Sequence, residues 1–119
     1  MKRKPTFDER VVLMAKKYGL NVKWQQLKYG FKRAAFTCGS YEEMYAIESL
    51  FTRMKDVVCE QWCCSLGEFD GRVYVMDAAD HEELENQCAA ERMRVEDWWE
   101  RYHDADEETR RLMACGVIA

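Results

Sequence analysis

The first twenty residues carry apolar side chains at the spacing of one helical face. These side chains are Phe7, Val11, Met14 and Tyr18. Thr6 and Glu9 form the two ends of a capping box, in which each side chain accepts a hydrogen bond from the other residue's backbone N–H. Gly19 stands where a left-handed C-terminal cap is expected. The pattern therefore predicts a helix that begins at Thr6 and ends near Gly19.

Two segments with alternating apolar residues follow, at residues 20–28 and 32–38. The alternating residues are Leu20, Val22 and Trp24 in the first segment, and Ala34, Phe36 and Cys38 in the second. Side chains that alternate in this way share one face of a strand. Gly30 lies between the two segments and suits a turn. We therefore predict a β-hairpin.

Two further helices begin where an acidic residue stands three positions after a capping residue. Ser40 and Glu43 open the second helix, and Asp80 and Glu83 open the third, which we predict to run to about Tyr102. The apolar positions are Met44, Ile47, Phe51, Met54 and Val58 in the second helix, and Leu84, Cys88, Val95, Trp98 and Tyr102 in the third. We expect this stripe of the third helix to be buried against the sheet.

A second hairpin is predicted between these helices. Its arms are residues 58–66 and 72–77, and the Asp70-Gly71 dipeptide favours a turn between them. Residues 57–64 are also compatible with a continuation of the second helix. The sequence leaves strand and helix open for this segment.

A short last helix is capped by Asp104 or Asp106 and ended by Gly116. The predicted order of elements is α-ββ-α-ββ-α-α. This order favours an α+β fold, in which two hairpins form an antiparallel sheet with helices on one face. We expect residues 1–119 to form one domain, with residues 1–5 as a flexible basic arm.

The predicted order contains a ββα unit twice. The helix starts at Ser40 and Asp80 are 40 residues apart, and each helix follows a hairpin that carries a tryptophan. A duplicated unit and a coincidence both explain this echo.

Charge is sorted along the chain. Residues 1–40 contain ten Lys and Arg and two acidic residues, whereas residues 77–119 contain five Arg and thirteen acidic residues. The net charge of −4 therefore hides a basic N-terminal third and an acidic C-terminal third. The basic segment could bind phosphates, but the acidic segment would repel them unless it faces away.

The composition argues against several classes of protein. Hydrophobic residues make up 48% of the chain, which is typical of a folded domain rather than a disordered one. No apolar run approaches the roughly 20 residues of a membrane span, and residues 1–5 lack the apolar segment of a secretory signal. We therefore expect a cytoplasmic protein whose six cysteines are reduced and lie mostly in the core.

Residues that could carry chemistry occur only in incomplete sets. Glu100 and His103 form a Glu-x-x-His pair, but a di-iron site needs a second pair, which His81 does not supply. The three cysteines within residues 59–64 lack the partner ligands of a zinc site. Neither a phosphate-binding glycine loop nor a nucleophile-elbow motif is present. We expect no catalysis, metal or cofactor, and the alternative left open is an enzyme with an unrecognised site.

The tip of the first hairpin is the first candidate binding site. It combines aromatic and cationic side chains: Lys28, Tyr29, Phe31, Lys32 and Arg33. Such residues can stack bases and hold phosphates. An ordinary hairpin, with its aromatic residues packed against a helix and its cations in solvent, explains the same sequence.

The Trp98-Trp99 pair is the second candidate. Adjacent helical residues point about 100° apart, so both can be buried only under a wide cover. Tryptophan is enriched in binding hot spots, and we predict that Trp99 contacts a partner protein. A wide core face covered by the last helix is the alternative.

These features favour a small non-catalytic module that docks onto a partner protein, which includes a second copy of itself. A regulator or inhibitor carried by a phage or mobile element could look like this, although no residue identifies one. The alternative is a nucleic-acid-binding protein that uses the basic N-terminal third. Salt dependence separates the two, because phosphate binding falls steeply with salt. No membrane association is expected.

Overall fold

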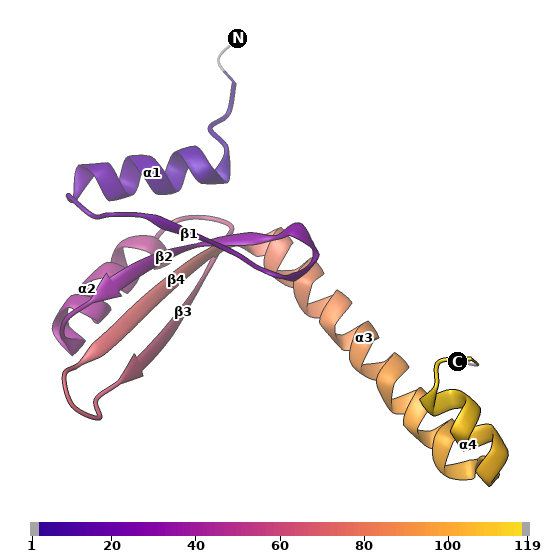
Figure 1. Ribbon diagram of the computed structural model, residues 1–119. Coiled ribbons are helices and arrows are strands. Elements are labelled where there is room, and N and C mark those ends of the chain that lie inside the picture. Colours follow the sequence, from indigo (N-terminus) through magenta and orange to yellow (C-terminus); the bar gives the residue numbers. More distant parts are fainter. Residues whose placement is uncertain (1–2, 118–119) are drawn as a thin grey trace. The chain divides into compact units, whose positions relative to one another are not determined.

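Figure 1 shows the computed structural model, which describes residues 3–117. The elements are α1 (Phe7–Lys17), β1 (Lys23–Gln26), the short 3-10 helix η1 (Lys28–Gly30), β2 (Lys32–Cys38), α2 (Tyr41–Thr52), β3 (Val57–Cys64), β4 (Asp70–Asp77), α3 (Ala78–Asp104) and α4 (Glu107–Ala114). The fold is α+β and its elements follow the order α-ββ-α-ββ-α-α, as predicted. Residues 57–64 form a strand, which decides between the two alternatives that the sequence left open.

The chain divides into two compact units, Met1–Leu84 and Glu85–Ala119. The first unit contains α1, the sheet, α2 and the beginning of α3. The second contains the rest of α3 and α4. We describe each unit by itself, and the organisation of residues 1–119 as one domain stays a prediction.

The four strands form one antiparallel sheet in the order β1-β2-β4-β3. β2 and β4 are the two central strands and pair with each other, whereas β1 and β3 form the edges. Each hairpin therefore contributes one central strand and one edge strand. A duplicated ββα unit would give this strand order. However, α2 has 12 residues and α3 has 27, and the duplication therefore stays a hypothesis.

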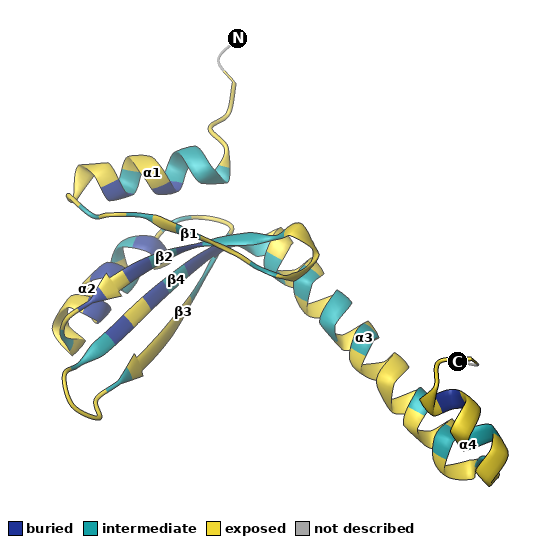
Figure 2. Ribbon diagram, in the orientation of Figure 1, coloured by how far each residue is buried: buried dark blue, intermediate teal, exposed yellow. Residues whose placement is uncertain are grey.

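The hydrophobic core lies between one face of the sheet and the helices α1 and α2. The buried residues of this cluster are Val11, Ala15, Ala34, Phe36, Cys38, Met44, Ile47, Phe51, Val73 and Val75. The rings of Phe36 in β2 and Phe51 in α2 are 4.8 Å apart at their centroids. Figure 2 shows the buried residues along β2 and β4 and on α1 and α2. Both helices therefore cover the same face, as predicted.

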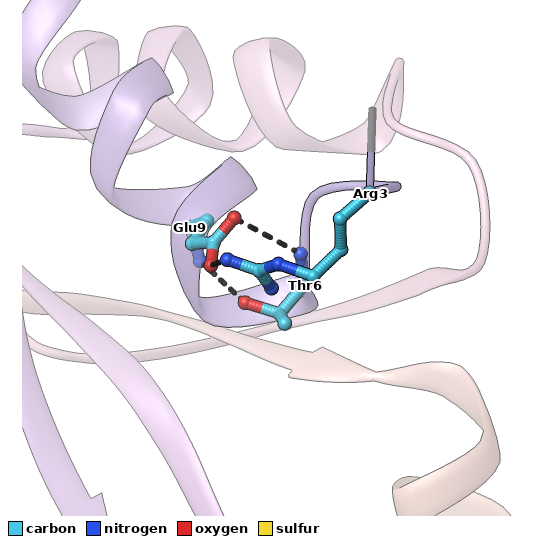
Figure 3. A network of polar contacts seen from close by, with 3 residues as sticks. All are labelled: Arg3, Thr6 and Glu9. Atoms are coloured by element: carbon cyan, nitrogen blue, oxygen red, sulfur yellow. Dashed lines mark hydrogen bonds and ion pairs between the residues drawn. The ribbon is translucent and has the colours of Figure 1, made fainter. Parts of the chain in front are cut away.

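The start of α1 is fixed by the predicted capping box (Figure 3). The Thr6 hydroxyl accepts the Glu9 N–H at 3.2 Å, and the Glu9 carboxylate accepts the Thr6 N–H at 3.4 Å. The Arg3 guanidinium also pairs with Glu9, at 2.6 Å. Arg3 belongs to the predicted basic arm, whose residues 1–2 lie outside the described residues, and its side chain is bound to α1.

The start of α3 differs from the prediction by a few residues. The sequence places it at Asp80, whereas the helix begins at Ala78. The Asp77 carboxylate accepts the Asp80 N–H at 3.2 Å and therefore satisfies one of the free backbone donors of the first turn. Asp77 is the capping residue, and Asp80 lies inside the helix.

The expected burial of α3 against the sheet stays a prediction, because α3 belongs to the second unit from Glu85 onward. No residue of this helix is buried, and Val95 is 51% exposed. Trp98 is half-buried, and its ring stacks on Tyr102 of the same helix with the centroids 5.3 Å apart.

Candidate functional site

The two cations that follow Phe31 point to opposite faces of the sheet. Lys32 pairs with Gln26 and Arg33 with Gln25 across the β1–β2 ladder, and neighbouring residues of a strand alternate between its faces. The Lys32 ammonium forms an ion pair with Asp8 of α1. The structure therefore does not bring Lys32 and Arg33 together, although both belong to the predicted site.

The other predicted residues of the hairpin tip surround a tight turn. Lys28 and Tyr29 lie in η1, where Tyr29 adopts a left-handed backbone conformation with φ 62°. Tyr29 is 44% exposed, and Phe31 is half-buried. The Leu27 N–H donates to the Phe31 carbonyl at 2.7 Å and closes the turn. The geometry is that of an ordinary hairpin, and the role of this tip in binding stays a prediction.

The sheet presents a second surface on the side opposite the core, which we call the outer face. Alternation along the four strands places thirteen residues there: Lys23, Gln25, Arg33, Ala35, Thr37, Val58, Glu60, Trp62, Cys64, Asp70, Arg72, Tyr74 and Met76. The alternate positions of β4, Val73 and Val75, are buried in the core. The outer face therefore carries many of the polar and aromatic residues of these strands, together with the apolar Ala35, Val58 and Met76.

Arg33 is held at the centre of the outer face by three neighbours. Its guanidinium carbon lies 3.7 Å from the centroid of the Tyr74 ring. Its Nε donates to the Gln25 side-chain oxygen at 2.6 Å, and its Nη1 lies 3.5 Å from the Glu60 carboxylate. Glu60 also contacts the His81 ring at 2.9 Å. These contacts fix one rotamer of Arg33.

Trp62 and Arg72 form a second cation–aromatic pair on the outer face. They are directly opposite each other in the β3–β4 ladder, and the Arg72 guanidinium carbon lies 6.0 Å from the Trp62 ring centroid. Arg72 also lies 3.5 Å from the Asp70 carboxylate. Trp62 is 48% exposed, so its ring is accessible to a partner.

Much of the positive charge on the outer face is neutralised within the protein. Arg33 pairs with Glu60, and Arg72 pairs with Asp70. Ion pairs of this kind reduce the attraction for phosphate groups, because a phosphate has to compete with a carboxylate already in place.

The second unit carries an aromatic cluster near the end of α3. The rings of Trp98 and Trp99 have centroids 5.0 Å apart, and Trp99 also contacts Tyr102 and His103. Trp99 is 49% exposed. This exposure is what a contact with a partner requires, and the predicted role of Trp99 stays a prediction.

The six cysteines are free thiols, but the expectation that most lie in the core is wrong. Only Cys38 is buried, whereas Cys63 and Cys115 are exposed. Cys63 is exposed because β3 is an edge strand, and Cys115 because it follows the last turn of α4. Burial, helped by the nearby Glu48 carboxylate, raises the pKa of the Cys59 thiol to about 11.

Histidine, cysteine and carboxylate side chains do not converge on a metal site anywhere in residues 3–117. Groups of three or more such side chains close enough to hold an ion are absent from this part of the chain. The same described residues contain no buried side-chain nitrogen or oxygen that lacks a hydrogen-bond partner.

The sequence-based prediction did not include the outer face as a site, although residue alternation in β3 and β4 indicates this face. Arg72 and Tyr74 alternate with the buried Val73 and Val75, and Trp62 lies on the same face as Glu60. Alternation alone therefore places these residues together on one face of β3 and β4. It does not show that Arg33 belongs beside them, because this needs the pairing of β2 with β4.

Comparisons with known proteins identify no relative. No protein-family model matches the chain, and neither a curated protein nor a solved structure matches it.

None of the helices within residues 3–117 is long and apolar enough to cross a membrane.

Proposed function

We propose that this protein is a non-catalytic module that binds a partner protein through the outer face of its sheet. The observation that carries this proposal is the occurrence of two cation–aromatic pairs on this face, Arg33 with Tyr74 and Arg72 with Trp62. Trp, Tyr and Arg are the residue types most enriched in the hot spots of protein interfaces. A partner would therefore bind side chains that already have fixed positions.

The fixed position of Arg33 supports this proposal energetically. Ordering a long side chain on binding costs roughly 0.5–1.5 kcal/mol. The contacts of Arg33 with Gln25, Glu60 and Tyr74 order this side chain before a partner arrives. Less conformational entropy is therefore lost on binding than at a surface of mobile arginines.

A protein partner is favoured over a nucleic acid because of the charge pairing. Arg33 and Arg72 each have a carboxylate within 3.5 Å, and Lys32 is paired with Asp8. A nucleic-acid site would need several cations directed at phosphates from one side. The alternative function is nucleic-acid binding, and the exposed Trp62 ring is the feature that supports it.

The cellular location and the role of the module are also part of the proposal. A cytoplasmic location is supported by the six free cysteines, because reducing compartments keep thiols unpaired. Docking onto a partner is how a small regulator or inhibitor acts, and we propose this role for the module.

The test uses the tagged full chain to capture partners from the native host. The wild type is compared with the double variant Trp62→Ala/Arg72→Ala, and Leu66→Ala is the matched control because Leu66 is 93% exposed in the β3–β4 loop. Capture is repeated after nuclease treatment and at low and high salt. We expect a captured protein that stays bound after nuclease treatment and at high salt. The wild type and Leu66→Ala should capture this protein, and the double variant should not.

A second measurement separates this function from the alternative. Single-stranded and duplex nucleic acids are titrated into the wild type and into the triple variant Lys28→Ala/Lys32→Ala/Arg33→Ala. We expect binding weaker than about micromolar near 150 mM salt. Tighter binding that is lost in the triple variant would replace the protein-binding proposal with the nucleic-acid one.

A further inference from the structure

The two edges of the sheet are protected very differently. β1 has four residues and includes Lys23, whereas β3 has eight residues, Val57–Cys64, with Glu60 as its single charge and no lysine or proline. β3 pairs with β4 without interruption from Val57 to Cys64, so no bulge bends this edge away. Natural proteins block long edges with lysine, proline, bulges or a covering element, because an open edge pairs with another strand.

The helix layer is also incomplete above β3. α2 contacts β3, and the Glu48 carboxylate on this flank of the helix helps to raise the pKa of the Cys59 thiol in β3. Tyr41 and Tyr45 lie on the same flank at helical spacing from Glu48 and are 46% and 59% exposed. Tyrosine is enriched in protein interfaces. The Tyr41 ring contacts Phe69 with the centroids 4.6 Å apart, and both tyrosines keep about half of their surface exposed. The edge of β3 and this flank of α2 therefore leave exposed surface on the same side of the first unit.

We propose that a second copy of this chain covers this edge. β3 pairs antiparallel with the partner's β3 about a two-fold axis, and one sheet continues through both copies. The same symmetry brings the flank of α2 that carries Tyr41 and Tyr45 against the identical flank of the partner. A two-fold interface needs a surface that complements itself, and here both layers meet their own copies at once.

Charge and side-chain direction select the register of this pairing. Paired residues of an antiparallel ladder share a face, so odd-numbered residues of β3 face odd-numbered residues of the partner. Placing Glu60 opposite the partner's Glu60 would oppose like charges, which is unfavourable. The neighbouring allowed register places Gln61 opposite the partner's Gln61. It sets Trp62 opposite the partner's Glu60, so the partner's carboxylate approaches the cation–aromatic pair of Trp62 and Arg72.

A stable dimer requires contacts from both the β3 strand pair and the flanks of α2. A stable interface buries about 1,600 Å² in total, and one strand pair alone covers less than this. The α2 flanks add a second layer of contact over the strand junction, with Tyr41 and Tyr45 as its large side chains. The dimer does not depend on the partner-binding function of the outer face, and its test needs no other protein.

The first experiment measures the mass of the full chain by sedimentation equilibrium under reducing conditions. Gln61→Lys places two ammonium groups opposite each other at the axis, and Gln26→Lys is the matched control, since Gln26 is an exposed residue of the other edge strand. We expect a dimer for the wild type and for Gln26→Lys. We expect about a tenfold or greater rise in the dimer dissociation constant for Gln61→Lys. Circular dichroism checks that each variant folds.

The second experiment traps the register. Gln61→Cys and, as control, Gln26→Cys are each made in a Cys63→Ser/Cys115→Ser background and oxidised with diamide, which accepts the two electrons and two protons of the thiol pair. We expect a covalent dimer for Gln61→Cys and a monomer for Gln26→Cys. A wild type that stays monomeric at 100 micromolar, a dimer unaffected by Gln61→Lys, or equal cross-linking of both cysteine variants overturns the proposal.

Discussion

The guanidinium of Arg33 stacks on the ring of Tyr74, with its central carbon 3.7 Å from the ring centroid. The two residues lie on the neighbouring strands β2 and β4, and both point away from the core. Their contact connects the two hairpins on the outer face, just as Phe36 and Val73 connect them on the buried face. It therefore has a role in stability that can be measured apart from any role in binding.

The first prediction concerns the strength of this contact. Arg33→Ala and Tyr74→Leu should not be additive, and we expect a coupling free energy of about 0.5–1 kcal/mol in a double-mutant cycle, since partly exposed cation–π pairs have this strength. Urea unfolding of the four proteins gives the value. The cycle for Arg72 and Trp62 is the control, because that pair is 6.0 Å apart and should couple less. Full additivity at Arg33 and Tyr74 would show that the stacking contributes nothing.

The second prediction concerns the core. Phe51 is fully buried, and its ring centroid lies 4.8 Å from that of Phe36. Phe51→Ala should therefore lower the free energy of unfolding by about 3–5 kcal/mol. Leu66→Ala, at a residue that is 93% exposed, should change it by no more than about 0.5 kcal/mol. Denaturant melts of both variants decide. Similar small losses for both would place Phe51 outside the cooperative core.

Local signals in the sequence predicted most of the fold of the first unit. The capping box of Thr6 and Glu9 and the alternation around Phe36 each act within a few residues, so their physics is visible in the sequence. The expected turn at Asp70-Gly71 was wrong, because both residues pair within β4 and the connection from β3 is formed by residues 65–69. Local signals do not decide whether the apolar stripe of α3 is buried. Its apolar stripe has the spacing of a buried face, but whether a helix face is buried depends on the surface that other elements leave for it.

The candidate site shows the same limit. The prediction grouped Lys32 and Arg33 because they are adjacent in the sequence, whereas a strand sends adjacent side chains to opposite faces. Alternation could have corrected this pairing. The sequence could not supply the strand order β1-β2-β4-β3, which sets Arg33 beside Tyr74 and leaves β3 at the edge.

The third prediction concerns thiol reactivity. Burial raises the pKa of the Cys59 thiol to about 11 and also raises the pKa of the Cys38 thiol, whereas Cys115 is exposed. The thiolate is the reactive form, and an ordinary thiol has a pKa of about 8.5. Cys59 should therefore hold roughly two-hundredfold less thiolate than an ordinary cysteine at pH 8. Timed alkylation followed by peptide mass spectrometry should label Cys115 first and Cys38 and Cys59 last.

Unfolding provides the control for this order. In concentrated urea the three thiols lose their separate environments and should be labelled at similar rates. Early labelling of Cys59 in the folded protein would contradict the partial burial that raises the pKa of its thiol.

The last prediction concerns the pH dependence of α4. Hydrogen bonds from Thr109 hold the pKa of the Asp106 carboxyl below its ordinary value, and the Thr109 N–H lies 2.7 Å from this carboxylate at the helix start. Because the pKa is lower in the folded state than in the unfolded state, the carboxylate stabilises α4 fully above the unfolded value of about 3.9. This stabilisation is lost as the pH falls through the folded pKa. The Thr109 amide resonance of the full chain should therefore titrate with a midpoint below about pH 3.9. Asp106→Asn keeps an acceptor oxygen but has no proton to gain, so this titration should disappear, whereas Asp104→Asn should leave it unchanged. A midpoint above the ordinary carboxyl value, or the same titration in Asp106→Asn, would show that another group controls the start of α4.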